Sequence, residues 1–219
     1  MINLQKLNKT YFLKNTNVVA LNAINLHIHE GDFIAIMGES GSGKSTLLNI
    51  LGILDKPTAG TFLFEDSDIS KLTEPEAARF RRQKVGFVFQ NFNLLPKLSV
   101  SNNVQMPLLL KGISKNTARS YADLVLEKVG LINRKNHKPN ELSGGQQQRV
   151  AIARSLINDP KIIIADEPTG NLDSETSKNI LELFGQLNKE GKTIIMVTHS
   201  ETSAKYANRV IQLKDGNII

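Results

Sequence analysis

Apolar residues follow two different spacings along this chain. Residues 18–29, VVALNAINLHIH, alternate between apolar and polar side chains, which is typical of a half-exposed antiparallel strand. Short apolar-rich stretches predict further strands at 32–37, 60–65, 85–89, 161–166 and 193–199. The N-terminal part is therefore expected to be β-rich, and several of its strands are apolar enough to be buried.

Between residues 91 and 159 the spacing becomes helical, at 99–112, 117–130 and 144–157, without a convincing strand pattern. A helix at 174–189, a short helix and a terminal hairpin turning at Asp215-Gly216 complete the pattern. Strands that alternate with helices predict an α/β fold with a mainly parallel sheet covered on both faces. We expect an N-terminal antiparallel β-subdomain and an inserted α-helical subdomain. The sequence stops inside the last hairpin strand, and whether the C-terminus is truncated does not follow from the sequence.

Composition places the chain among ordinary globular proteins. Its 219 residues suit one domain with an insertion, and 40% are hydrophobic while 22% are charged. There is no cysteine, no signal-peptide pattern and no apolar run near the ~20 residues of a membrane span. We therefore expect a soluble, cytoplasmic protein. The net charge of +6 is spread along the chain, with residues 80–84, FRRQK, as its densest cluster. This favours a solvated basic surface, and no nucleic-acid partner is expected.

The clearest chemical signal is GESGSGKS, Gly38 to Ser45, which fits the pattern G-x-x-x-x-G-K-[ST] between a predicted strand and a predicted helix. Its backbone amides and the helix N-terminus attract phosphate oxygens. We expect Lys44 to reach the β- and γ-phosphates, Ser45 to bind Mg²⁺ and Thr46 to contact the α-phosphate. The candidate phosphate-binding residues are Gly38, Glu39, Ser40, Gly41, Ser42, Gly43, Lys44, Ser45 and Thr46.

Asp166 and Glu167 follow the apolar run IIIA, at the C-terminal end of a predicted strand. Ligands of open α/β sheets bind at this end. Asp166 is expected to hold Mg²⁺ through water, and Glu167 to polarise an attacking water. The alternative is an acidic strand end that caps the next turn.

Three further side chains are candidates by position. His199 follows the strand-like TIIMVT and could contact a γ-phosphate. Gln90 follows VGFVF and could sense metal and nucleotide, although a polar strand cap is the simpler explanation from the sequence alone. Tyr11, expected in an N-terminal loop, could stack on an adenine ring, or it could be a core aromatic. His27 and His29 share one face of a β-run, are expected to be exposed, and are too few for a metal site.

A second glycine-rich stretch, LSGGQQQR at 142–149, raises the question of a second anion site. Glycine pairs cost helix stability, so the pair at the start of a predicted helix needs a reason. A phosphate near Ser143 and the glycine amides would supply one.

Together these motifs resemble the ATP-binding cassette (ABC) ATPases over essentially the whole chain. The resemblance implies ATP and Mg²⁺ as ligands and a P-loop, RecA-like single domain. Residues 1–90 and 160–219 would form the nucleotide-binding core with its β-subdomain, and residues 91–159 the helical signature subdomain. Two copies would close head to tail around two ATP molecules. By the same resemblance, the cofactor-binding residues outside the phosphate loop are Tyr11, Ser143, Gly144, Gly145 and Asp173, the metal ligands are Ser45, Gln90 and Asp166, and the catalytic residues are Glu167, His199 and Gln90.

Residues 47–61 and 88–112 resemble more narrowly the branch that serves macrolide export, lipoprotein release, cell division and peptide resistance. The implied partner is a permease with a large extracytoplasmic region, which would hold this chain at the cytoplasmic face of the membrane. Phe92, Leu94 and Leu95 are candidates for the permease-facing groove, or they pack inside the helical insertion. Ser200 replaces an acidic residue frequent in the family, and little consequence is expected. The sequence does not identify the transported substrate. It also does not decide whether the system exports a substrate or transmits mechanical work.

Two other classes share this nucleotide chemistry. Chromosome-maintenance and DNA-repair ATPases carry very long coiled-coil or zinc-bearing insertions, whereas about fifty residues separate Gln90 from Ser143 here and cysteine is absent. Translation factors of the superfamily contain two cassettes, and this chain has one. Both classes are therefore disfavoured.

Overall fold

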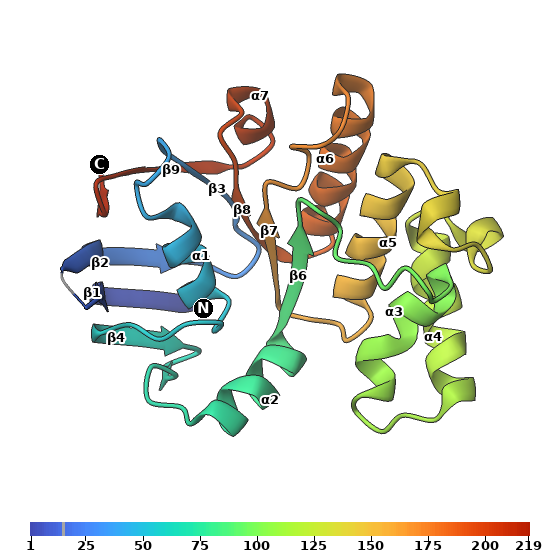
Figure 1. Cartoon of the computed structure of the whole chain (residues 1–219), viewed down its shortest axis with the longest axis horizontal. Helices are drawn as coiled ribbons and strands as arrows, with labels where there is room; N and C mark the ends of the chain where they lie inside the picture. Colours follow the sequence, from blue (N-terminus) through green and yellow to red (C-terminus); the bar gives the residue numbers. More distant parts are fainter. Residues whose placement is uncertain (15) are drawn as a thin grey trace.

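The computed structural model describes residues 1–14 and 16–219, which form two β-sheets and a group of helices (Figure 1). The antiparallel sheet has the order β2-β1-β4-β5 and the larger sheet the order β10-β9-β3-β8-β7-β6. In the larger sheet all neighbours are parallel except β10, which pairs with β9 in a terminal hairpin. The strands are β1 (Ile2–Phe12), β2 (Asn17–Ile28), β3 (Phe33–Met37), β4 (Ala59–Phe64), β5 (Ser67–Asp68), β6 (Val85–Phe89), β7 (Ile162–Asp166), β8 (Thr193–Val197), β9 (Arg209–Lys214) and β10 (Asn217–Ile218).

Helices follow the strands of the larger sheet, and residues 91–159 form a helical segment between β6 and β7 that contains no strand. This segment holds α3 (Val100–Leu109), α4 (Lys115–Lys128) and α5 (Gly144–Leu156), with two short 3₁₀ turns at Ile132–Arg134 and Pro139–Glu141. The other helices are α1 (Lys44–Leu51), α2 (Glu74–Lys84), α6 (Ser174–Lys189) and α7 (Glu201–Ala204).

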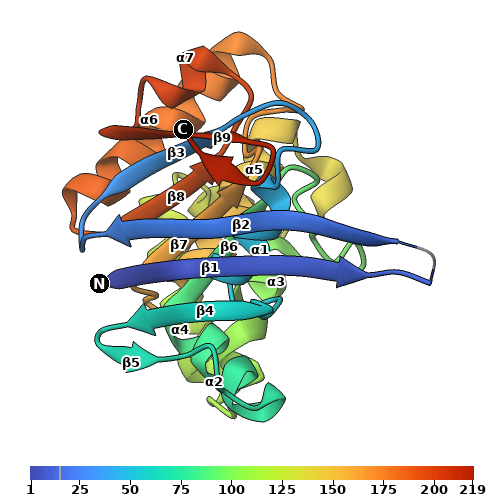
Figure 2. The ribbon, with the colours of Figure 1, turned by 90° about the vertical axis from the view of Figure 1, so that its left-hand side faces the viewer.

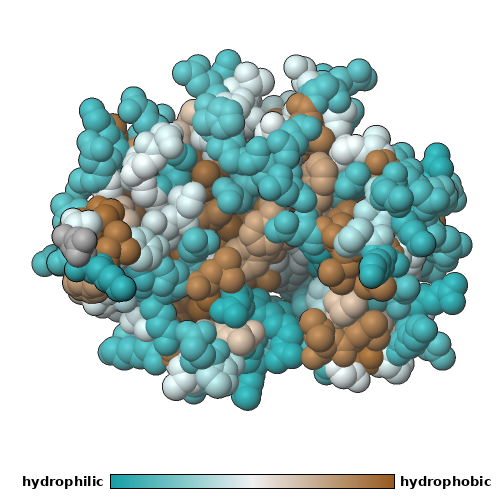
Figure 3. Space-filling view, viewed as in Figure 1, coloured by the Kyte–Doolittle hydropathy of each residue, from teal (hydrophilic) through white to brown (hydrophobic). Residues whose placement is uncertain are grey.

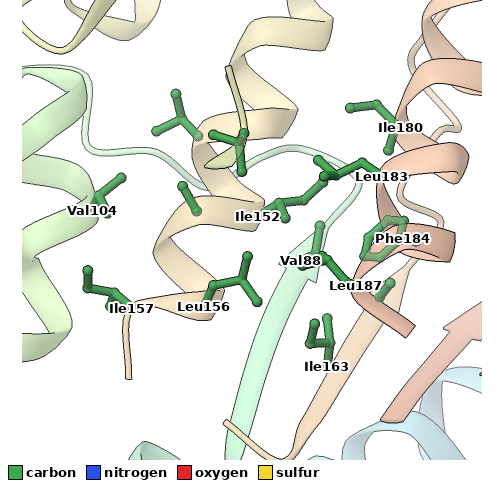
Figure 4. Packing of buried hydrophobic residues seen from close by; sticks show 14 of the residues in the cluster. Val88, Val104, Ile152, Leu156, Ile157, Ile163, Ile180, Leu183, Phe184 and Leu187 are labelled. Atoms are coloured by element: carbon green, nitrogen blue, oxygen red, sulfur yellow. The ribbon is translucent and has the colours of Figure 1, made fainter. Parts of the chain in front are cut away.

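The parallel sheet separates two hydrophobic clusters. Alternate residues of β3 belong to different clusters, Phe33 and Ala35 to one and Ile34 and Ile36 to the other. The first cluster packs the sheet against α5, α6 and the rest of the helical segment (Figure 4). The second lies between the parallel strands and the antiparallel sheet, which Figure 2 shows in front of α1. Both faces of the parallel sheet are therefore covered, which explains why its strands are apolar throughout.

The strands predicted from apolar runs are confirmed, as are the helices that begin near residues 100, 115, 144 and 174. Helix α2 was not anticipated, because only Ala77 of its residues is buried and the helix shows no apolar stripe. A capping box between Thr73 and Glu76 begins this helix instead.

The prediction that Tyr11 lies in a loop is wrong, because Tyr11 is the penultimate residue of β1. Register shifts between Leu4 and Leu7, and on both sides of Lys9, interrupt the pairing of β1 with β2. These irregularities break the alternation of apolar and polar residues along β1. The alternation therefore does not extend to Tyr11, although the strand does.

Candidate active site

The candidate site lies at the edge of the parallel sheet where its strands end. Phe89, the last residue of β6, pairs with Asp166, and Asp166 pairs with Val197 at the end of β8. On the next strand, β3, Ile36 pairs with Val197, so the loop that starts at Gly38 leaves from the same level. Parallel pairing in this register therefore brings the loops after four strands together.

The first of these loops, residues 38–43, connects β3 to α1 and leaves no room for side chains at two positions. A Cβ atom at Gly38 would lie 2.1 Å from the carbonyl oxygen of Leu213, and one at Gly43 would lie 2.4 Å from that of Ala20. Gly43 also has a φ of 102°, which side chains disfavour, and it begins α1 without a side-chain cap. The first amides of α1 are therefore available to an anion.

Two polar side chains, one in this loop and one at the start of α1, fit a phosphate chain. The Lys44 Nζ atom donates hydrogen bonds to the carbonyl oxygens of Gly38 (2.8 Å) and Glu39 (2.7 Å), so the ammonium lies over the loop. The buried hydroxyl of Ser42 has no hydrogen-bond partner among the described residues. Phosphate oxygens would satisfy both donors, so the residues present fit the triphosphate of ATP.

The second loop places the two candidate carboxylates in different environments. Asp166 is the last residue of β7, whereas Glu167 has left the strand with a φ of 45° and donates its amide to the carbonyl oxygen of Val197. The Oε1 atom of Glu167 lies 2.9 Å from Nδ1 of His199, which follows β8. The Glu167 side chain is 18% exposed and that of His199 is 72% exposed. Glu167 is therefore held in place while its histidine partner faces solvent.

Burial raises the pKa of Asp166, and the neighbouring charge of Glu167 raises it further, while Lys44 opposes both effects. A cation beside Asp166 would relieve this cost of ionisation. The described residues contain no group of three or more His, Cys, Asp or Glu side chains placed to hold a metal on their own. A Mg²⁺ ion held by Ser45 and Asp166 would thus depend on phosphate and water for its other ligands.

Gln90 directly follows β6 and contacts the turn that precedes α6. Its Nε2 atom donates to Oδ1 of Asn171 (3.1 Å), and Nδ2 of Asn171 donates to the Gln90 carbonyl oxygen (3.2 Å). Gly170 makes room for this contact, since a Cβ atom there would lie 2.7 Å from Gln90 Nε2. Asp173, two residues after Asn171, caps α6 by accepting hydrogen bonds from the amide (2.9 Å) and hydroxyl (2.6 Å) of Thr176.

The second glycine-rich stretch opens α5, as the sequence indicated. Ser143 caps this helix in a capping box with Gln146 and is exposed. Gly145 is buried, and a Cβ atom there would lie 2.3 Å from Cγ2 of Thr176 on α6. Close packing of two helices thus also requires a glycine at 145, which sequence reasoning had attributed to an anion alone. Helices α1 and α5 lie on opposite sides of β6 and β7 (Figure 1), and they contribute to different hydrophobic clusters.

The structure adds contacts that the sequence did not single out. Gln148 of α5 is buried and donates to the carbonyl oxygen of Pro168, just after Glu167 (2.7 Å). Arg154 of the same helix donates to the carbonyl oxygens of Phe92 (2.9 Å) and Asn93 (2.6 Å). These contacts join residues 20 to 62 positions apart, so no local pattern signals them.

An apolar groove lies between α2, the strand β6 and the helical segment. Figure 3 shows apolar surface beside the hollow between these parts of the molecule. Of the three candidates for such a groove, only Leu95 lines it, and it is 43% exposed. Leu94 packs against the first hydrophobic cluster, and Phe92 is half-buried. The groove is lined by Leu54, Ala78, Arg81, Arg82, Val85, Gly86, Phe87, Phe89, Leu95, Met106, Pro107, Leu110, Arg154, Ser155 and Asn158.

The chain resembles ABC transporter proteins in sequence. A family model described as ABC transporter matches residues 21–170. The ABC transporter ATP-binding protein YknY of Bacillus subtilis, which is described as uncharacterized, is 49% identical over 219 residues, which cover 100% of this chain and 95% of that protein. The macrolide export ATP-binding/permease protein MacB of Bdellovibrio bacteriovorus is 50% identical over 220 residues. The match covers the whole of this chain but only 33% of that longer protein.

Solved structures of one relative share the fold. The dimeric structure of the bacterial ABC transporter cassette MJ0796 superposes with a TM-score of 0.90 at 49% identity, covering 100% of this chain and 96% of that one. A dimeric post-hydrolysis state of the same cassette, bound to ADP and Pi, gives a TM-score of 0.90 at 48% identity with the same coverage. A protein of this name from Methanocaldococcus jannaschii is 50% identical to the chain. Within residues 1–14 and 16–219 no helix has the length and apolar character needed to span a membrane.

Proposed function

This chain belongs to the ABC transporter family and is an ATPase of that family, and we propose that it closes with a second copy of itself around two ATP molecules to power a membrane permease. The observation that carries the proposal is the shared edge of the sheet, where the phosphate loop, Asp166, Glu167 and His199 meet. In the same proposal, residues 1–90 and 160–219 are the nucleotide-binding core and residues 91–159 the helical signature subdomain.

At this edge each side chain has a distinct task. The loop amides and Lys44 bind the β- and γ-phosphates. Ser45 and Asp166 would hold Mg²⁺, which when bound would supply positive charge to neutralise the phosphates. Glu167 accepts the proton of the attacking water, because its carboxylate is held at the strand end by packing and by contact with His199. His199 is exposed enough to reach the γ-phosphate of a bound nucleotide. Gln90, whose side chain donates to Asn171, would be a further ligand of that metal.

The second copy supplies the other half of each site. Ser143 and the α5 N-terminus are exposed, and they lie on the helical segment and not beside the phosphate loop of their own chain. Gly144 and Gly145 contribute backbone amides to this helix N-terminus, which can approach the γ-phosphate bound by the partner. Asp173 lies in the turn that precedes α6 and caps that helix. In the proposed dimer this turn crosses to the other copy, and the cap fixes its backbone.

The permease would dock in the apolar groove. Arg81, Arg82 and Arg154 line it together with Leu95 and Met106, and none of the described residues that line it is acidic. The segment that fits is an amphipathic helix with apolar residues on one face and carboxylates beside them. MacB of Bdellovibrio bacteriovorus is named as an ATP-binding and permease protein in one chain, which supports a permease as the partner of this chain. We further propose that the chain lies on the cytoplasmic face of the membrane, and that the permease has a large extracytoplasmic region. Export or mechanical transmission would then depend on that permease.

Two measurements test the proposal. Purified chain should release phosphate from ATP in a Mg²⁺-dependent reaction, and the chain should co-purify with an integral membrane protein from detergent extract. Arg82→Glu should weaken binding to the membrane protein, because the new carboxylate would repel the carboxylates of the permease helix that the groove is proposed to bind. Arg79→Glu is the matched control, since Arg79 lies on the same helix, is exposed, and does not line the groove. Equal recovery of the membrane protein with both variants would contradict docking in this groove.

A further inference from the structure

An ion-pair network surrounds Tyr11 at the end of β1. The Tyr11 hydroxyl donates a hydrogen bond to Oδ2 of Asp55 (2.9 Å), and Nζ of Lys9 donates to the other oxygen, Oδ1 (2.5 Å). The backbone amide of Lys56 also donates to Oδ1 (2.7 Å). Lys9 is fixed in turn by the carbonyl oxygen of Lys56 (2.8 Å), and its side chain is only 12% exposed. Asp55 thus accepts three hydrogen bonds, of which one comes from the tyrosine.

The same network restricts the two faces of the Tyr11 ring differently. Lys9 and Tyr11 are two residues apart on one strand, and Nζ of Lys9 lies 4.8 Å from the ring centroid. A lysine at this distance interacts with one face of the ring and excludes a flat ligand from that face. A base that stacks on Tyr11 must therefore approach from the opposite face.

Asp55 is itself fixed to the helix that begins with the phosphate loop. The amides of Leu54 (2.8 Å) and Asp55 (3.2 Å) both donate to the carbonyl oxygen of Asn49, in the last turn of α1. Helix α1 starts at Lys44 and spans about 12 Å over its eight residues. The segment from Lys44 to Asp55 therefore sets the separation between the phosphate loop and the hydroxyl of Tyr11.

We propose that Asp55 is a positioning residue for nucleotide binding: it fixes the Tyr11 ring, with Lys9 on one face, at the height where the adenine of a nucleotide held by the phosphate loop stacks on the other face. This inference rests on the proposed function, because it takes Tyr11 as the residue that contacts adenine. The hydrogen bond fixes the outer end of the side chain and Lys9 lies over one face of the ring, so ATP need not order the ring when it binds.

The charge state of Asp55 agrees with this arrangement. Burial on its own would raise the pKa of Asp55, but hydrogen bonds from Lys9, Tyr11 and the Lys56 amide outweigh it and lower the pKa below its ordinary value. The acceptor for the Tyr11 hydroxyl is therefore a carboxylate at neutral pH, and hydrogen bonds to charged acceptors are the stronger kind.

The test separates the base from the phosphates by comparing Mg-ATP with Mg-tripolyphosphate, which has no base, in calorimetric binding to the full chain. Asp55→Ala should weaken ATP binding about fivefold, within the range expected for one aromatic contact, and leave tripolyphosphate binding within about twofold. Asp55→Asn, which keeps an acceptor oxygen, should recover part of the loss. The matched control is Asp123→Ala, since Asp123 pairs with Lys135 at 2.7 Å with similar exposure on α4, and it should change neither affinity.

A second pair of variants shows whether Asp55 acts through Tyr11. Tyr11→Phe removes only the hydroxyl and should weaken ATP binding about threefold, and adding Asp55→Ala should give no more loss than Asp55→Ala alone. Equal weakening of ATP and tripolyphosphate by Asp55→Ala would show a general structural role and overturn the inference. If Asp55→Ala does not fold, Tyr11→Phe still decides, because unchanged ATP affinity would also overturn it.

Tyr11→Ala separates this inference from the proposed function. If Tyr11→Ala leaves ATP affinity unchanged, adenine does not stack on this ring, and the proposed role of Tyr11 fails together with that of Asp55. If Tyr11→Ala weakens ATP binding about tenfold while Asp55→Ala and Tyr11→Phe have no effect, only the positioning role fails.

Discussion

Replacing Glu167 by glutamine removes a base while preserving most contacts of the side chain. The carboxylate lies 2.9 Å from Nδ1 of His199 and is 18% exposed. Glutamine has the same length and keeps one oxygen that can accept a hydrogen bond from the imidazole. We therefore expect the free energy of unfolding to change by less than ~1 kcal/mol, which corresponds to a shift in Tm of less than ~4 °C for a chain of this size.

The effect on hydrolysis should be far larger than the effect on stability. A positioned general base accounts for roughly 10²–10⁴ in rate, or about 3–5 kcal/mol of the activation barrier. Binding of ATP uses Lys44, Ser45 and the loop amides, none of which contacts Glu167 through a described hydrogen bond. Closure uses Ser143 of the facing copy. The variant should therefore bind ATP and close, but accumulate in the closed state.

The assay combines phosphate release with light scattering or size-exclusion chromatography in ATP with Mg²⁺ and in ADP with Mg²⁺. Glu167→Gln should release phosphate at least about a hundredfold more slowly and form a dimer with ATP but not with ADP. Glu182→Gln, an exposed glutamate in α6 on an i,i+4 pair with Lys178, is the control and should behave as the unaltered chain. Normal phosphate release together with no ATP-dependent dimer would remove Glu167 from the mechanism and leave it as a turn residue.

Three further predictions follow from the same geometry. Lys44→Ala should reduce both ATP affinity and turnover at least about tenfold. When Lys44→Ala chains are mixed with Ser143→Arg chains, each mixed dimer should keep at most one intact site. Full ATPase activity of either variant alone would contradict composite sites. Gly145→Ala should lower the free energy of unfolding by about 1–3 kcal/mol in urea titration, because its Cβ would lie 2.3 Å from Thr176, and an unchanged midpoint would mean that α5 and α6 shift freely. Asp166→Asn should raise Tm in Mg²⁺-free, nucleotide-free buffer at neutral pH. Burial and a neighbouring carboxylate raise the pKa of Asp166 in the folded state, so its ionisation costs stability once the pH rises above the ordinary pKa of an aspartate. The advantage of the variant should therefore shrink toward pH 4. A pH-independent difference in Tm would refute that account.

The sequence determined the main elements of the fold and the positions of the phosphate loop and the carboxylates. Strands that are buried on both faces are apolar without alternation, and the five-residue length of β3, β6, β7 and β8 is typical of a strand and too short for a helix. The pattern failed at β1, where bulges disturb the alternation, and at α2, whose eleven residues bury only Ala77. In both cases the local sequence carries little apolar periodicity, so pairing partners and caps decide the structure.

Tertiary structure alone decided which side chains meet. The register Phe89–Asp166–Val197 brings Glu167 to His199 across 32 residues, and strand order cannot be read from the strands one at a time. The sequence suggested a phosphate as the reason for the glycine pair near Ser143, whereas the structure shows that Gly145 is also required by close contact with α6. The hydrogen bond from Tyr11 to Asp55 likewise joins residues 44 positions apart. Local patterns encode propensity and burial, but contacts between distant segments depend on packing that only the complete fold specifies.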